Sequence, residues 1–155
     1  MTQLSRKARY ALRALYALTA DEARGPILIA DLAERENIPR KFLEAILLEL
    51  KNAGVLKSKK GKGGGYALAR AADQITIGQI VRIIDGPLAP VPCASERAFV
   101  RCEECVDETT CGTRQVMKKV RDAIAAILDG TTLADVQAQM ARARISTGTT
   151  VSYSI

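Results

Sequence analysis

The sequence has 155 residues, 48% hydrophobic and 26% charged, so it is long enough for one ordinary globular core and too apolar for wholesale disorder. Aromatic residues make up 4% and tryptophan is absent, so the core must be built from aliphatic side chains, which suit helices. Histidine is absent, which excludes histidine-dependent catalysis and histidine-ligated metal sites. We therefore expect a mainly α protein that is not an enzyme.

The net charge of +6 is unevenly distributed along the chain. Residues 1–70 contain 14 Lys and Arg against 7 Asp and Glu, whereas residues 71–155 contain 9 against 10. The basic excess of the first half is typical of a surface that binds phosphates, although a solubilising surface would have the same composition. The N-terminal segment lacks the unbroken apolar stretch of a signal peptide, and no segment resembles a membrane span, so we expect a cytoplasmic protein.

Three short helices are predicted first. The apolar residues of the first helix recur at helical spacing from Leu4 to Leu18, and a second helix fits residues 29–35. A third helix begins at Pro39, a favoured first residue, and stops before Gly54, which can adopt the left-handed cap conformation. We expect this helix to turn its apolar side chains inward: Phe42, Leu43, Ile46, Leu47 and Leu50.

A hairpin and a fourth helix follow. Residues 55–60 and 66–68 are strand candidates on either side of a glycine-rich tip at residues 61–65. Thr76 and Gln79 have the spacing of a capping box, which predicts a helix that continues to Ile84.

Three short helices followed by a hairpin is the element order of a winged helix-turn-helix, whose third helix enters the major groove of double-stranded DNA. The first turns of that helix carry Arg40, Lys41 and Glu44. Arg40 or Lys41 could donate to guanine or to a phosphate, and Glu44 could accept from a cytosine amino group. The same residues would also suit an ordinary solvated helix face.

The hairpin tip combines positive charge with glycine, which favours a DNA-binding wing. Glycines let the backbone approach a groove and offer N–H groups to phosphates, while lysines release counterions. A nucleotide-binding P-loop is excluded because no Gly-Lys-Ser/Thr opens a helix here, and a plain turn does not explain three lysines beside four glycines. The candidate DNA-binding residues of the wing are Lys59, Lys60, Lys62, Gly63, Gly64, Gly65 and Tyr66.

From Pro87 to about Thr113 the sequence has no helical or strand period, which predicts a long loop. A long helix with a coiled-coil-like seam follows, on Val116, Val120, Ala123 and Ile127. The predicted organisation is a winged helix-turn-helix domain over 1–75, a connecting helix and cysteine loop over 76–112, a long dimerisation helix and a short terminal helix over 113–144, and a mobile tail over 145–155.

The loop carries Cys93, Cys102, Cys105 and Cys111, with the spacing C-x8-C-x2-C-x5-C. Four thiolates this close in sequence can bind one metal centre, and soft thiolates select iron–sulfur clusters, zinc or copper(I). Spacing alone leaves iron–sulfur and zinc open. Structural zinc usually has two close cysteine pairs, and here only Cys102 and Cys105 form one.

Several segments resemble the IscR/NsrR/RirA-type bacterial regulators, the Rrf-two superfamily. These segments are residues 4–12, 29–33, 61–69 and 76–81, together with Asp85. The resemblance covers residues 1–92 closely, and the cysteine loop and long helix more loosely. It implies a homodimer that is joined through the long helix and reads a pseudo-palindromic operator. It also implies that Lys41, Glu44 and Lys60 contact DNA.

The resemblance favours an iron–sulfur cluster over zinc, because members of that family ligate a cluster through three cysteines. The matching positions here are Cys93, Cys105 and Cys111. The histidine that is often the fourth ligand is replaced by Arg114, and residues 7–9 offer no acidic substitute. We therefore expect Cys102 as the fourth ligand and all-cysteine ligation, with 4Fe–4S slightly favoured over 2Fe–2S.

A cluster in this loop would lie between the DNA-binding half and the long helix, so its loss would alter the spacing of the two recognition helices. We expect a transcriptional regulator, acting as a repressor, that senses iron, redox or nitrosative state. Three alternatives stay open: a thiol/disulfide or persulfide sensor using Cys102 and Cys105, a DNA-binding protein stapled by zinc, and a cysteine-based oxidoreductase, for which the βαβ pattern is missing.

Overall fold

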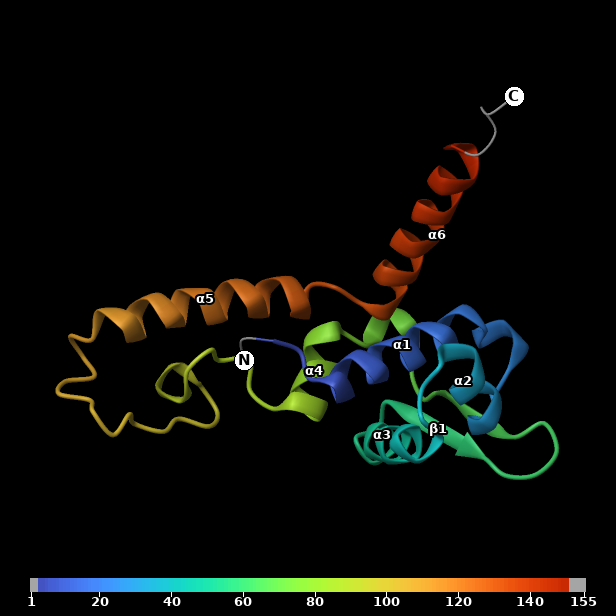
Figure 1. Cartoon of the computed structure of the whole chain (residues 1–155), viewed down its shortest axis with the longest axis horizontal. Helices are drawn as coiled ribbons and strands as arrows, with labels where there is room; N and C mark the ends of the chain where they lie inside the picture. Colours follow the sequence, from blue (N-terminus) through green and yellow to red (C-terminus); the bar gives the residue numbers. More distant parts are fainter. Residues whose placement is uncertain (1–2, 151–155) are drawn as a thin grey trace.

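The chain forms six α-helices and one two-stranded sheet over residues 3–150, the part that this computed structural model describes, with side chains up to residue 147 (Figure 1). The helices are α1 (Arg6–Ala20), α2 (Ile29–Glu36), α3 (Arg40–Asn52), α4 (Ile77–Asp85), α5 (Gly112–Asp129) and α6 (Leu133–Thr150). The strands are β1 (Leu56–Lys59) and β2 (Gly65–Leu68), and single 3-10 turns are η1 (Glu22–Arg24), η2 (Ala72–Gln74) and η3 (Pro92–Ala94). The predicted mainly α class and winged-helix element order are confirmed.

The turn between α2 and α3 forms at Asn37, whose left-handed backbone (φ 50°) ends α2. Asparagine tolerates this conformation better than most residues that carry a Cβ. Pro39 is the N-cap of α3, so this helix begins one residue later than expected, at Arg40. Gly54, just beyond α3, has a φ of 76°, as predicted.

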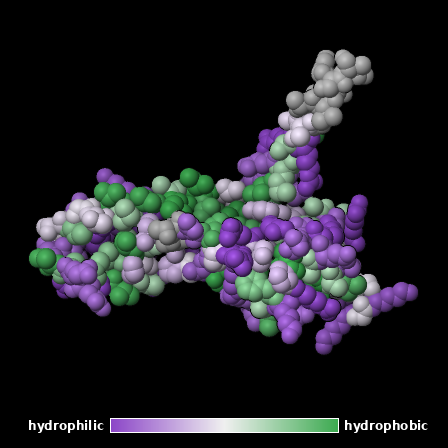
Figure 2. All heavy atoms as spheres, in the orientation of Figure 1, coloured by the Kyte–Doolittle hydropathy of each residue, from purple (hydrophilic) through white to green (hydrophobic). Residues whose placement is uncertain are grey.

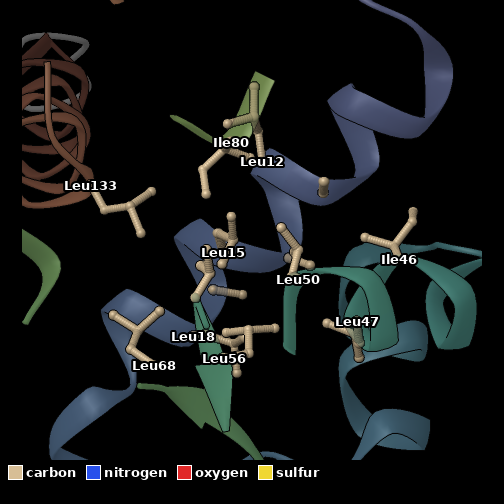
Figure 3. Close-up of a cluster of buried hydrophobic side chains, with 14 of the residues drawn as sticks. Leu12, Leu15, Leu18, Ile46, Leu47, Leu50, Leu56, Leu68, Ile80 and Leu133 are labelled. Atoms are coloured by element: carbon tan, nitrogen blue, oxygen red, sulfur yellow. The ribbon is translucent and has the colours of Figure 1, made fainter. Parts of the chain in front are cut away.

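Aliphatic side chains from α1, α3, both strands, α4 and α6 form one core (Figure 3). Each of those labelled in the figure is at most 7% exposed: Leu12, Leu15, Leu18, Ile46, Leu47, Leu50, Leu56, Leu68, Ile80 and Leu133. Burial of this apolar surface holds the three-helix unit and the hairpin together.

The C-terminal helix begins inside this core. Leu133 in the first turn of α6 is fully buried, and its N–H donates to the Ile75 carbonyl at 2.9 Å. The Ile77 N–H donates to the Thr131 carbonyl, also at 2.9 Å. The start of α6 therefore packs with the N-terminal half of the chain, whereas the rest of α6, and α5 with the loop before it, project away from the body (Figure 1).

Two predictions about the helices are wrong, one about a buried residue and one about where the last helix ends. Phe42 is 41% exposed, because it lies one residue outside the buried stripe of α3 and packs edge-on against Tyr10 of α1, with ring centroids 5.7 Å apart. The final helix does not end near residue 144 but continues to Thr150. The Ser146 and Thr147 hydroxyls donate to carbonyls four residues earlier, a bond compatible with helix. Of the predicted mobile tail, residues 151–155 lie outside the described residues.

Two capping side chains fix α4 against its neighbours. The Thr76 hydroxyl accepts from the Gln79 N–H at 3.2 Å, which confirms half of the expected capping box, while the Gln79 side chain accepts from Arg70 instead. At the other end, Asp85 accepts from the backbone N–H and the hydroxyl of Ser5, the N-cap of α1. None of the helices over residues 3–150 combines the length and apolar character needed to cross a bilayer.

We expect Leu47→Ala to lower the free energy of unfolding by about 2–5 kcal/mol, because this fully buried side chain would leave a cavity. Leu48→Ala is the matched control, since Leu48 is on the same helix but 52% exposed, and its effect should stay within about 0.5 kcal/mol. Urea denaturation followed by circular dichroism measures both. Equal losses for the two variants would contradict the assignment of the core face of α3.

Candidate nucleic-acid interface and cysteine loop

The first turns of α3 expose all three of the residues predicted to read DNA. The Arg40 guanidinium lies 3.3 Å from the Glu44 carboxylate, one helical turn further on, so these two charges partly neutralise each other. Lys41 is exposed and makes no ion pair within the described residues. In the free protein the net positive charge of this surface therefore comes from Lys41.

A second basic surface lies on α1 beside α3. Arg6, Arg9 and Arg13 are exposed at positions i, i+3 and i+7 and line a shallow depression together with Tyr10. The Arg13 guanidinium lies over the Tyr10 ring at 5.8 Å, and Tyr10 contacts Phe42 on α3. The spacing of the arginines is visible in the sequence, but their place beside the recognition helix is not. The basic surface is thus larger than the residues singled out by sequence.

In the hairpin, β1 and β2 pair antiparallel from Leu56 opposite Leu68 to Lys59 opposite Gly65. Figure 1 shows the hairpin and α3 on the side of the body away from α6. Lys59, Lys60, Lys62 and Gly63 are all exposed, and hydrophilic side chains project from this end of the molecule in Figure 2. The hairpin therefore presents the predicted cluster of lysines to solvent.

Three of the predicted wing residues have structural roles. A Cβ on Gly64 would lie 2.3 Å from the Lys59 carbonyl oxygen, and one on Gly65 would lie 2.2 Å from that of Ile27. The backbones of Tyr66 and Ile27 exchange two hydrogen bonds, of 2.8 and 2.9 Å. Part of the glycine run is therefore explained by close backbone packing, and DNA contact by Gly64, Gly65 and Tyr66 stays a prediction.

The cysteine loop runs from the end of α4 to the start of α5. Cys93 lies in η3 and is only 5% exposed. Cys111 is the N-cap of α5, and its sulfur accepts from the Arg114 N–H at 3.4 Å. Just before Cys111, the Asp107 carboxylate accepts hydrogen bonds from Thr109 and Thr110. These bonds lower the pKa of Asp107, and those from Thr109 have the largest effect.

The Cys102 thiol is influenced by two of the other three thiols. A hydrogen bond with Cys93, followed by slight desolvation and by the charges of Cys93 and Cys111, raises the pKa of the exposed Cys102 thiol. Cys105 is not among the groups that act on Cys102, although its N–H donates to the Cys102 carbonyl at 3.2 Å. The group with the largest effect on the Cys102 thiol is therefore Cys93 and not Cys105, the partner expected from the sequence spacing.

The donor set of this loop suits a thiolate-bound metal centre, since four soft sulfur ligands lie within 19 residues. Within the described residues, however, no three potential ligands already surround a common metal position. Of the two cysteines in the middle of the loop, Cys102 is exposed and Cys105 is half-exposed.

The comparisons with known proteins agree with this architecture. A family model named Rrf2 and described as an iron-dependent transcriptional regulator matches residues 4–139. An Rrf2-like HTH-type transcriptional regulator of Rhodobacter capsulatus is 42% identical over 139 residues, which cover 87% of this chain and 92% of that protein.

Two solved structures are similar over most of their length. CymR, the global cysteine regulator of Bacillus subtilis, has a TM-score of 0.74 and 32% identity over 90% of this chain and 98% of its own. IscR of T. potens has a TM-score of 0.71 and 29% identity over 89% and 88%. The resemblance seen in the sequence is thereby confirmed, and these relatives are regulators rather than enzymes. The chain belongs to the Rrf2 family of transcriptional regulators.

Proposed function

We propose that the protein is a homodimeric repressor that binds a pseudo-palindromic operator and responds to iron, redox or nitrosative state through an iron–sulfur cluster on Cys93, Cys102, Cys105 and Cys111. One observation carries this proposal: the loop with all four thiols connects α4, part of the DNA-binding body, to α5, and Cys93 and Cys111 both contact Arg114 at the start of α5. A change in the loop therefore acts where the body meets the long helix. A protein of this function works where the DNA is, in the cytoplasm.

Lys41 and Glu44 at the start of α3 would contact bases in the major groove, with Arg40 on a base or a phosphate. Lys59, Lys60 and Lys62 in the wing would contact phosphates, with Gly63 allowing close backbone approach. Support comes from the exposure of all these residues and from the position of α3 and the hairpin on the same side of the body (Figure 1).

The dimer would form through α5. This helix has no buried residue, and its apolar seam is open to solvent, with Val116 53%, Val120 38% and Ile127 68% exposed. Figure 2 shows hydrophobic residues gathered along this helix. A helix in water rarely leaves such a seam uncovered, and pairing of two α5 helices would bury it.

An iron–sulfur cluster would supply a group that oxidants, nitric oxide or iron shortage can remove. The contribution of the chain is mechanical. Ligation by Cys102 and Cys105 would draw the middle of the loop towards Cys93 and Cys111, which are fixed next to α5. Two recognition helices must lie about 34 Å apart to fit successive major grooves, so a small change at the base of α5 changes affinity.

The effect of Cys93 on the Cys102 thiol, the largest cause of its raised pKa, favours a second candidate function, in which these two thiols form a reversible disulfide under oxidation. CymR, to which the structure is similar, is the global cysteine regulator of its organism. In this candidate Cys105 has no role, which separates it from the cluster.

We expect protein purified without oxygen to contain iron and acid-labile sulfide, and its operator affinity to change when the cluster is removed. Cys105→Ser should lose the iron, because all-cysteine ligation needs this residue. If wild-type protein lacks iron, and Cys105→Ser still responds to peroxide while Cys102→Ser does not, the disulfide candidate is correct and the cluster is not. Iron and sulfide assays measure the cluster content, and fluorescence anisotropy with labelled operator DNA measures the affinity.

Val120→Glu should dissociate the dimer, because the new charge would lie in the buried seam. Ala126→Glu introduces the same side chain about 120° around the helix, at an exposed position, and should leave the dimer intact. Analytical ultracentrifugation gives both masses. A dimeric Val120→Glu protein would refute the assignment of this seam.

Lys60→Ala and Lys62→Ala should each lower the slope of log affinity against log salt concentration by about 1, because each would remove one phosphate contact. Arg144→Ala, an exposed cation on α6, is the control and should keep the wild-type slope. Anisotropy titrations at several salt concentrations test this. Wild-type slopes in both lysine variants would show that Lys60 and Lys62 do not contact phosphates of the operator.

A further inference from the structure

The side chain of Arg114 connects three separate parts of the cysteine loop. Its Nε donates to the Cys93 carbonyl oxygen at 2.9 Å, and its Nη1 donates to the Glu108 carbonyl oxygen at 3.2 Å. The guanidinium also lies over the Phe99 ring, 5.6 Å from the centroid. One half-buried residue in the first turn of α5 thus holds both ends of the loop.

Arginine suits this task for a geometric reason. A planar guanidinium offers donors in several fixed directions and a flat face for an aromatic ring, whereas a lysine ammonium is a point charge. The partners of Arg114 within the described residues are two main-chain carbonyls and a ring, so these contacts do not depend on the ionisation of the acidic residues in the loop.

A second arginine supports the same turn. Arg121 lies two helical turns further along the same face of α5, and its Nη1 donates to the Ala94 carbonyl oxygen at 2.5 Å. Its side chain is only 14% exposed and also lies 3.4 Å from the Glu96 carboxylate. Successive carbonyls, of Cys93 and Ala94, are therefore held from one helix.

The middle of the loop makes a different kind of contact. The Arg101 guanidinium donates to the Cys105 carbonyl at 3.1 Å, and the Cys105 N–H donates to the Cys102 carbonyl at 3.2 Å, so these backbone contacts stay within one local turn. Val106 next to this turn is 96% exposed. Within the described residues, the turn at residues 101–106 makes no hydrogen bond to α5.

We propose that Arg114 is the positioning residue of the cysteine loop: its side chain holds Cys93 against the start of α5, where Cys111 is the N-cap, and leaves the turn at residues 101–106, with Cys102 and Cys105, free to adjust. This role of Arg114 adds detail to the sensor function proposed above. It depends on that function only for the identity of the signal that the loop senses. Cys93 and Cys111 thus have fixed positions before anything binds. A metal centre or a disulfide in the loop would form when Cys102 or Cys105 moves towards them.

Arg114→Ala in the full-length, metal-free protein tests the proposal. Under native conditions iodoacetamide should modify Cys93 slowest in the wild type, and at least about tenfold faster in Arg114→Ala, because the lost hydrogen bonds from a charged donor had opposed local opening. The rate at Cys102, read in the same mass spectra, should stay within about twofold. Hydrogen exchange of the amides at residues 92–100 should rise in parallel, which excludes an effect on thiol ionisation alone.

Arg101→Ala is the matched control, since it removes a guanidinium that only spans the local turn. It should leave Cys93 modification and exchange at residues 92–100 unchanged. Arg114→Lys keeps the charge but offers a point donor, so it should rescue the slow rate only in part. Faster hydrogen exchange of the α3 amides would show that Arg114→Ala disturbs the whole fold. In that case the rate of Cys93 modification in Arg114→Lys alone tests the proposal.

Wild-type rates at Cys93 in both Arg114 variants would overturn the proposal, as would equal effects of Arg114→Ala and Arg101→Ala. The result is independent of the proposed cluster, because the measurement uses metal-free protein. Absence of iron from oxygen-free preparations would refute the cluster and leave the positioning role of Arg114 untouched.

Discussion

The contact between Asp129, at the end of α5, and α4 determines how the two halves of the molecule meet. Arg82 on α4 donates two hydrogen bonds to the Asp129 carboxylate, at 2.5 and 2.9 Å. This pairing raises the pKa of Arg82, and its hydrogen bonds lower that of Asp129. The approach requires Gly78, because a Cβ there would lie 2.0 Å from the carboxylate. The side chains of the pair are partly exposed, so its contribution is more to geometry than to stability.

The geometry of α5 follows from this contact. Its C-terminal end is fixed to α4, and α4 is in turn fixed to α1 by the hydrogen bonds between Asp85 and Ser5. Further along α5, Arg121 and Arg114 face the cysteine loop. The face that carries Val116, Val120 and Ile127 lies on the other side of the helix and is open. One face of α5 thus contacts its own chain, and the opposite face is free for a second copy.

Sequence periodicity was sufficient for the helices, the hairpin and the order of elements, because those depend on local spacing of apolar residues and on caps such as Gly54. Sequence periodicity failed where contact with a neighbouring element determines whether a residue is buried. Phe42 has the composition of a core residue, but Tyr10 of α1 offers it an aromatic contact at the surface. Likewise, Gly64 and Gly65 belong to the glycine-rich tip in sequence, yet backbone packing against Lys59 and Ile27 accounts for them.

The candidate site shows the same limit. Sequence spacing places the four cysteines in one loop, and it suggests Cys102 and Cys105 as a pair because they are close along the chain. Which thiols interact is a tertiary property, however, and Cys93, in the η3 turn, is the group with the largest effect on the Cys102 thiol. Arg114 was recognisable in the sequence only as a missing ligand. Its role as a donor to two carbonyls depends on where the loop begins and ends.

The division of the loop into held and free thiols has a consequence for sensing. A loop that is wholly unstructured must lose the entropy of all its residues when it binds a partner, whereas a loop with anchored ends loses only that of its middle. The anchors here lie on α5, which Asp129 and Arg82 connect to the DNA-binding body. In the proposed regulator, movement of the turn at residues 101–106 therefore acts against a fixed base. Any strain it generates passes to α5 and to α4 rather than being absorbed within the loop.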